Sequence, residues 1–394
     1  MKITDIRTTM VTVPFAVFGN FEPVTMWYST RYASIHCVTF IDTDEGITGV
    51  ATEGDQHTIM ERIRPRLIGR DPFDIERIEQ ELGGAIRGRW EIDTKTMAAV
   101  DNALWDIIGK ACGKPLYRLW GGKVNDPVHV RYWLSCKSPE RQAAEALKAV
   151  ERGWRSFKIK LGTDPRTDLQ RVKAVREAVG DDIELCFDIN GGYPLHVAIN
   201  TLRKMARYEP ASVEDPVPNF WPYDPGSLDN MADIRRMTGV PVEAHSHGPN
   251  CIEFVKALIN KRAADALHLS VQFVGGVLEA KRVCAVAEAG GLMVTGQSSA
   301  AELGPRNALM LHFITSERSF RGTNDSSTHL LEPPSGDIIK EEFRTVDGTL
   351  RAPEGPGLGV EIDEKKLVCY HETYFSGKFQ HTTGLGRKNP YLWF

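Results

Sequence analysis

Three short apolar runs that end in charged residues decide the fold: FKIKL (157–161), ELCFD (184–188) and ASVE (211–214). Successive charged ends are separated by roughly 25–30 residues, which is about the length of one βα unit. If the runs are consecutive strands of a parallel barrel, their charged ends meet at one mouth. A charge at the end of a buried strand is costly unless it is paired or used. The pattern therefore predicts either a metal and base site or ordinary salt bridges at the strand ends.

Strand and helix signals alternate on both sides of these runs, from residue 128 to about residue 332, where the eighth strand is expected near His329–Glu332. Repeated βα units of this kind predict a parallel (β/α) barrel. Residues before 124 show antiparallel strands and an amphipathic helix at 94–110, and turns and strands return after Gly336. We predict an α/β protein with a modified (β/α) TIM barrel at 125–335. An α+β capping domain at 1–124 is completed by the segment 336–394.

Composition excludes several classes of protein. With 42% hydrophobic and 25% charged residues and a formal net charge of -4, the chain is globular and has no basic footprint for nucleic acid. No segment approaches about 18 continuous apolar residues, and the N-terminus lacks the apolar run of a signal peptide. The seven cysteines have no CxxC spacing, as expected of reduced thiols. We expect a cytoplasmic protein that binds neither nucleic acid nor membranes.

The carboxylates at the strand ends suit a magnesium ion. Asp188 and Glu214 are hard oxygen ligands of the kind that Mg²⁺ prefers. A third ligand should come from the fifth strand, which ends in EAHSH (243–247). His245 is our first candidate and His247 the second, although imidazole suits softer metals better. Either histidine could instead contact the substrate or act as an acid.

Lysine 160 is the candidate base. Alternation along a strand directs Lys158 and Lys160 to the same side, with Ile159 on the other. A neighbouring ammonium and a divalent cation favour the neutral form of a lysine. We therefore expect Lys160 to remove a proton alpha to a carboxylate, with Mg²⁺ stabilising the enediolate. Lys158 would stay charged beside that carboxylate.

Two loops of the N-terminal region are candidates for binding the substrate. The first loop holds Trp27, Tyr28 and Arg31, which could contact an anionic substrate or merely pack against a neighbour. The second loop, with Glu53, Asp55 and Gln56, supplies His57.

The sequence resembles the enolase superfamily, of the mandelate racemase and muconate lactonizing enzyme type. The matching motifs occur in the family's order: ALWDI (103–107), GK (109–110), LWGG (119–122), KIK (158–160), DIN (188–190), VEDP (213–216), GGV (275–277) and PGLGVEID (356–363). The resemblance implies a capping domain over a modified barrel, with Mg²⁺ and proton abstraction alpha to a carboxylate. It assigns metal ligands to Asp188 and Glu214 and the base to Lys160.

Departures from the family pattern reduce the number of reactions to be expected. The fifth strand lacks the usual acidic ligand, and Ser270 and Phe273 lie where relatives often place an aspartate or lysine. Gln297, a candidate substrate ligand, lies where some relatives carry a catalytic histidine. Racemisation needs a group on each face of the carbon, whereas loss of a β-hydroxyl needs one base and an acid, for which His245 or His247 are candidates.

We therefore predict dehydration of a sugar acid, an aldonate or aldarate, to a 2-keto-3-deoxy acid. Two alternatives remain: a racemase, epimerase or cycloisomerase acting on a carboxylate, and a non-catalytic member of the superfamily. We also expect the protein to form a homo-oligomer and to bind a small-molecule carboxylate as its substrate.

Overall fold

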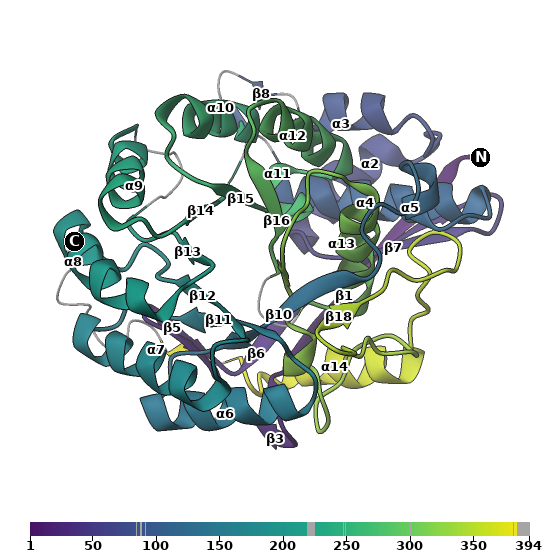
Figure 1. The fold of residues 1–394 in the computed structure, drawn as a ribbon. Coiled ribbons are helices and arrows are strands. Elements are labelled where there is room, and N and C mark those ends of the chain that lie inside the picture. Colours follow the sequence, from purple (N-terminus) through teal and green to yellow (C-terminus); the bar gives the residue numbers. More distant parts are fainter. Residues whose placement is uncertain are drawn as a thin grey trace.

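The protein is a barrel of strands and helices beside a smaller α+β unit (Figure 1). The computed structural model describes residues 1–83, 85–86, 89–90, 92–218, 225–246, 248, 250–298, 302–380 and 382–383.

Eight parallel strands form the barrel and follow one another around it in chain order. They are β10 (Val128–Leu134), β11 (Ser156–Lys160), β12 (Glu184–Asp188), β13 (Ser212–Glu214), β14 (Val242–His245), β15 (Ala266–Leu269), β16 (Met293–Gly296) and β17 (Asn324–Asp325). The two ends of the series meet because β17 pairs with β10, and the amide of Gly296 donates to Oδ1 of Asn324 at 2.7 Å. The barrel is therefore nearly closed.

Helices surround the barrel and bury its outer face (Figure 1). They are α6 (Pro139–Glu151), α7 (Pro165–Val179), α8 (Leu195–Met205), α9 (Pro225–Thr238), α10 (Cys251–Lys261), α12 (Val277–Ala289) and α13 (Gly304–Ser316). The short α11 (Val271–Val274) follows β15 directly. Local sequence sets where the helices begin: Ser138 and Asp164 cap α6 and α7, and each is followed by a proline.

The capping unit is built on an antiparallel sheet of β1 (Ile3–Pro14), β6 (Ala33–Thr43) and β7 (Thr48–Thr52). The buried helix α4 (Thr94–Ala111) packs against this sheet and also contacts α11 of the barrel. The remaining elements of this unit are β2 (Ala16–Val17), β3 (Asn20–Phe21), β4 (Val24–Met26), β5 (Ser29–Arg31), α1 (Gln56–Thr58), η1 (Ile59–Ile63), α2 (Arg64–Leu67), α3 (Ile75–Gly83), β8 (Ala85–Ile86) and β9 (Arg89–Trp90). The helix α5 (Leu116–Leu119) leads into the barrel.

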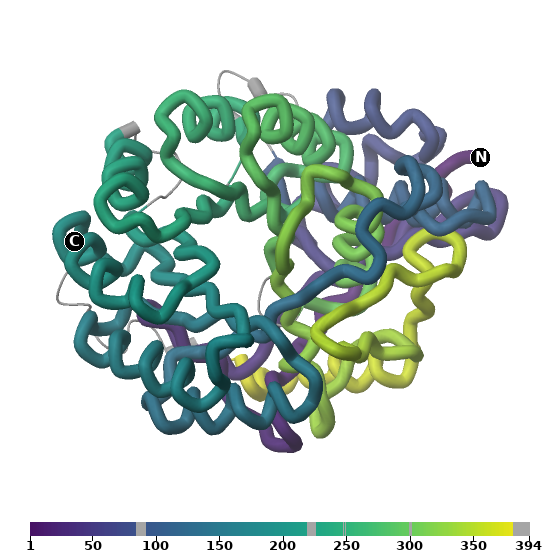
Figure 2. The backbone as a smooth tube through the Cα atoms, viewed as in Figure 1, coloured from purple at the N-terminus to yellow at the C-terminus, as the bar shows by residue number. Residues whose placement is uncertain are grey.

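The C-terminal part of the chain returns to the capping unit, as the yellow end of the tube shows (Figure 2). Helix α14 (Glu364–Ser376) packs against β1, and Nδ1 of His371 lies 2.7 Å from the carbonyl oxygen of Met10. Two short strands, β18 (Thr349–Leu350) and β19 (Thr382–Thr383), pair with β10 and β5. The predicted fold class is therefore confirmed.

The predicted position of the eighth strand was wrong. The strand is β17, and His329 lies in the 3-10 helix η3 (Thr328–Leu330), where its ring stacks on Tyr132 with centroids 3.8 Å apart. Leu330, the last residue of η3, and Leu331, which follows it, are buried in the core. Two residues in a polar stretch are enough to pair with β10.

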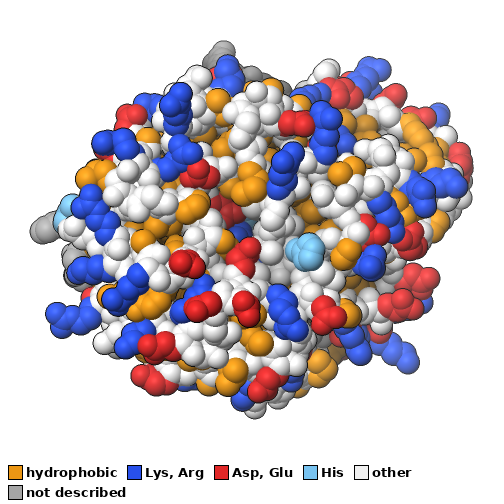
Figure 3. Space-filling view, in the orientation of Figure 1, with side chains coloured by type: hydrophobic (Ala, Val, Ile, Leu, Met, Phe, Trp, Pro, Cys, Tyr) orange, Lys and Arg blue, Asp and Glu red, His pale blue; other side chains and the backbone are white. Residues whose placement is uncertain are grey.

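Positive and negative side chains are interspersed over the face in Figure 3, in keeping with a net charge close to zero. No helix among the described residues combines the length and apolar character needed to cross a bilayer.

Candidate active site

Buried charged and polar side chains fill the barrel interior in two layers. The lower layer consists of Arg131, Lys158, Glu243, His268, Asp325 and Glu214, all nearly inaccessible to solvent. Glu214 is shared with the mouth layer, because it is in register with Asp188. The mouth layer, one step closer to the carboxyl ends of the strands, consists of Lys160, Asp188, His245 and Ser270. Both layers follow from alternation, because residues two apart on a strand point to the same side.

The lower layer is a closed network of ion pairs. Lys158 pairs with Glu214 and, at 2.6 Å, with Asp325. Arg131 pairs with Asp325 at 2.5 Å, and its Nη2 lies 3.1 Å from both carboxylate oxygens of Glu243. Three carboxylates therefore surround two permanent cations.

Histidine 268 completes the charge balance of the lower layer. Its Nδ1 lies 3.1 Å from Glu243 and its Nε2 lies 3.0 Å from Asp325. Burial and Lys158 lower the pKa of His268, but Glu214, Asp325 and Glu243 together raise it to about 9. His268 is therefore an imidazolium at neutral pH, and the six charges of the layer cancel.

The mouth layer contains the predicted base beside a predicted metal ligand. Lys160 pairs with Asp188, and its ammonium lies 4.1 Å from the ring centroid of Trp133. Asp188 is level with Glu214 on the neighbouring strand. Burial, and then Asp188, raises the pKa of Glu214. Two carboxylates are thus close together in a site with little water.

The expected lowering of the pKa of Lys160 is not found. Burial does lower it and Lys158 acts in the same direction, but the facing carboxylate of Asp188 raises the pKa above its ordinary value. The prediction counted the neighbouring lysine and a divalent cation but omitted the pairing with Asp188, and the effect of the cation stays a prediction.

The first loop of the capping unit reaches the barrel mouth. Nε1 of Trp27 donates to the carbonyl oxygen of Asn190, just beyond β12, at 3.1 Å. The largely buried Tyr28 interacts electrostatically with Lys160, and burial raises the pKa of its hydroxyl. Arg31, by contrast, is exposed on β5. A role in substrate binding stays a prediction for all three.

The other predicted site residues are less closely connected. His57 is exposed on α1. Gln297 is buried just after β16, where its backbone amide donates to the carbonyl oxygen of Leu269 at 2.8 Å. His247, a predicted catalytic residue, lies outside the described residues. His245 ends β14 at the mouth, with its ring centroid 5.7 Å from that of His268.

The second loop contacts the barrel through Glu53, which the sequence did not single out. Glu53 is buried and pairs with Arg306 of α13, which also pairs with Glu302 at 2.8 Å. Nη2 of Arg306 donates to Oγ of Ser270 at 2.7 Å. No sequence signal joins Glu53 to Arg306, because 253 residues separate them.

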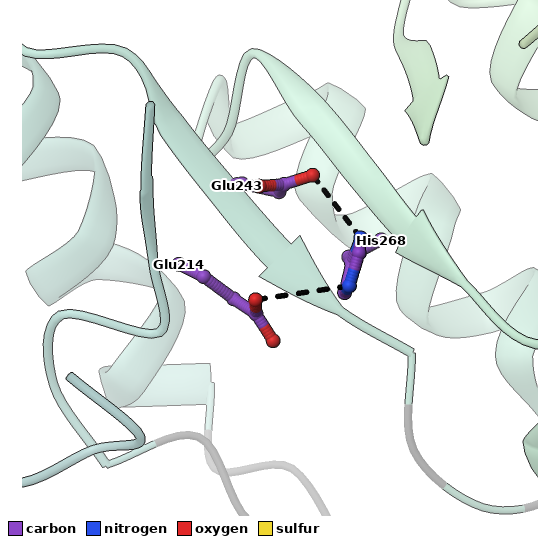
Figure 4. A group of neighbouring side chains, drawn as sticks. All are labelled: Glu214, Glu243 and His268. Atoms are coloured by element: carbon purple, nitrogen blue, oxygen red, sulfur yellow. Dashed lines mark ion pairs between the residues drawn. The ribbon is translucent and has the colours of Figure 1, made fainter. Parts of the chain in front are cut away.

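Three described residues could hold a metal ion by their spacing alone: Glu214, Glu243 and His268. In Figure 4, both glutamates extend from adjacent strands toward the histidine. Without a metal, these glutamates raise the pKa of His268, so a cation held by the three residues would have to displace a proton from the imidazole. Asp188 and Glu214, the ligands predicted from the sequence, are also in register on neighbouring strands, and two carboxylates suit Mg²⁺, so their role as ligands stays a prediction.

Residues 7–121 match the family described as mandelate racemase / muconate lactonizing enzyme, N-terminal domain, and residues 141–366 match the family described as enolase C-terminal domain-like. The chain belongs to the enolase superfamily. Its members share a Mg²⁺-dependent enediolate mechanism, and the chain is an enzyme of this superfamily.

Relatives in the superfamily catalyse different reactions. An N-succinyl-L-Arg/Lys racemase from Bacillus cereus is 29% identical over 93% of this chain and 97% of its own length, and its crystal structure superposes with a TM-score of 0.82. A D-galactonate dehydratase from Variovorax paradoxus is 28% identical over 88% of this chain and 93% of its own length. Others are named epimerases or cycloisomerases.

A crystal structure from Thermobispora bispora, of an enolase complexed with magnesium and formate, shares the fold. It has a TM-score of 0.82 and 24% identity, and the match covers 96% of this chain and 94% of that one.

Proposed function

We propose that the protein dehydrates a sugar acid, an aldonate or aldarate, to a 2-keto-3-deoxy acid. The observation that carries the proposal is the asymmetry of the mouth layer. Lys160 stands on one side, whereas Ser270 follows β15 on the other side and Gln297 and Ser298 follow β16. Among the described residues, therefore, no lysine or histidine directly follows β15 or β16.

Asp188 and Glu214, with His245 as the third candidate ligand, would hold the magnesium ion. When bound, Mg²⁺ would stabilise the negative charge that develops on the substrate carboxylate as the alpha proton leaves. The positive charge of Lys158, held at the bottom of the site by Asp325 and Glu214, adds to that stabilisation.

Lys160 supplies the proton transfer. The neutral amine of Lys160, which is the minor form while Asp188 faces it, takes the alpha proton, and the electron pair of the C–H bond forms the enediolate. The C–O bond at the beta carbon then breaks, and the ammonium of Lys160 can return the proton to a hydroxyl that leaves from the same face. The atoms balance as loss of one water, and the resulting enol becomes the keto acid. His245 and His247 are the alternative acids.

Racemisation is the second candidate, because the Bacillus cereus relative is named a racemase acting on N-succinyl-Arg/Lys. It requires a second proton carrier on the face opposite Lys160. Ser270 lies on that face, but its hydroxyl is too weakly acidic to carry a proton to and from the alpha carbon. This favours dehydration.

The test is to incubate the purified protein and Mg²⁺ with a library of aldonates, aldarates and N-acylated amino acids. The expected result is a 2-keto acid from at least one sugar acid, lost in Lys160→Ala and retained in Lys340→Ala, which changes an exposed lysine paired with Glu361. Proton NMR in D₂O reads exchange at the alpha carbon in parallel. Exchange without keto acid would establish an isomerase, and neither signal across the library would refute the proposal.

A further inference from the structure

The end of β15 faces the base across the barrel. β11 is the second strand and β15 the sixth of an eight-strand ring, so they lie on opposite sides. In the lower layer their side chains meet, because Nζ of Lys158 lies 3.1 Å from Nε2 of His268. Ser270 continues the strand with φ −124° and ψ 129° and lies two residues beyond His268, as Lys160 lies two beyond Lys158. In the mouth layer, Lys160 and Ser270 are therefore the opposed pair.

A buried guanidinium fixes the hydroxyl of Ser270. Arg306 can only donate, so in its contact with Ser270 the serine oxygen accepts. The hydroxyl proton of Ser270 must then point away from Arg306 and is available to another acceptor. Ser270 is fully buried and Arg306 is 3% exposed, so water does not compete for this contact.

Two carboxylates hold Arg306 in place, and they come from different parts of the fold. Glu302 precedes α13 in the barrel, whereas Glu53 follows β7 of the capping sheet. Because the pair of Glu53 and Arg306 is almost completely buried, loss of the Glu53 charge would leave Arg306 with Glu302 as its one remaining carboxylate in this cluster. The position of the Ser270 hydroxyl thus depends on the capping unit being in contact with the barrel.

We propose that Ser270 is a specificity-determining residue that donates a hydrogen bond to a substrate oxygen on the face away from Lys160, and that Glu53 is a positioning residue that acts through Arg306. The ligand it would take is a hydroxyl or carboxylate oxygen of the acid substrate. This inference rests on the proposed function, and it explains why one face carries a base and the other only a donor.

The experiment uses a sugar acid that the wild-type enzyme turns over, with keto-acid formation measured across a range of substrate concentrations. Ser270→Ala is expected to raise KM about tenfold, the size of one hydrogen bond, with a smaller change in kcat. Glu53→Gln should change KM in the same direction. Glu361→Gln, which removes an exposed charge, is the matched control and should leave both constants unchanged.

A double-mutant cycle separates positioning from general structural damage. If Glu53 acts through Ser270, Glu53→Gln adds little to KM in a Ser270→Ala background. Fully additive effects, or an unchanged KM in Ser270→Ala, would overturn the inference while leaving the proposed function standing. If Ser270→Ala is unfolded in a thermal melt, Ser270→Cys preserves the size of the side chain with a weaker donor, and an unchanged KM there has the same meaning. A wild-type enzyme inactive on every sugar acid would overturn both proposals.

Discussion

The two layers of charge inside the barrel differ in how completely they are neutralised. In the lower layer, three carboxylates face two permanent cations and a protonated histidine, so every charge has a partner within the protein. In the mouth layer, Lys160 and Asp188 pair beside Glu214, whose charge is disfavoured by Asp188. The difference suggests that the lower layer supports the fold and that the mouth layer is arranged for a metal and a substrate.

The largest expected effect comes from comparing the two lysines. Lys158→Met removes the buried cation that Glu214 and Asp325 share, and we expect the free energy of unfolding to fall by about 3–5 kcal/mol. Lys160→Met removes a single pair and should cost less stability while abolishing turnover. Urea unfolding of both variants, with keto-acid assays, checks this. Equal losses of stability would show that the two layers are not distinct.

Magnesium should distinguish the layers by its effect on stability. A ligand present at 100 times its Kd stabilises the folded state by about 2.7 kcal/mol, so Mg²⁺ should raise Tm in a thermal melt. We expect Asp188→Asn to lose this rise and Glu243→Gln to keep it, although Glu243→Gln is less stable overall. The reverse pattern would assign the metal to Glu214, Glu243 and His268 of the lower layer.

The lower layer should also weaken at high pH. The pKa of His268 is raised to about 9 from an ordinary value of 6.5 by Glu214, Asp325 and Glu243, against burial and Lys158. Its contribution is therefore complete below about pH 6.5 and is lost as the pH rises through 9. In EDTA, we expect the free energy of unfolding to fall by about 3 kcal/mol between pH 6.5 and 9.5.

His268→Gln should flatten this pH dependence. An unchanged slope in that variant would mean that another group titrates.

The charged strand ends of the mouth layer were predictable from sequence, and so were Lys158 and Glu214 of the lower layer, whereas the rest of the lower layer was not. Lys160, Asp188 and Glu214 each end a local apolar run, and period-two alternation places them at one mouth. Arg131 and Asp325, by contrast, pair across 194 residues, and Asp325 lies in a polar stretch with no strand signal.

The capping contact was also beyond the sequence. In the sequence, Glu53 stands out only as a neighbour of His57. Its pairing with Arg306 could not be predicted, because it depends on how the cap is placed on the barrel. Local patterns thus predict which side chains enter the barrel, but not which charges meet there.

A second buried acidic site, between the cap and the barrel, shows what happens when the cation is missing. Oδ2 of Asp101 on α4 accepts from the amide of Val277 at 2.7 Å, and Glu79 of α3 lies against the same carboxyl. Burial, and then Asp101, raises the pKa of Glu79 to about 11, while burial raises that of Asp101 to about 6. Glu76 adds to the repulsion, and Arg282 at the surface only partly offsets it.

The smallest predicted effect tests this second site. A carboxyl group whose pKa is raised by folding stabilises the folded state fully at acidic pH, and this contribution is lost as the pH rises from about 4. At pH 8, Glu79 therefore lowers the free energy of unfolding. In Glu79→Gln, the side-chain amide can still donate a hydrogen bond to Asp101, but unlike the carboxyl group it does not titrate. We expect it to raise the free energy of unfolding by about 1 kcal/mol at pH 8, with the advantage disappearing toward pH 4. Melts of wild type and variant across that range measure the difference, and a variant that is less stable at pH 8 would show that the two carboxyl groups do not share a proton.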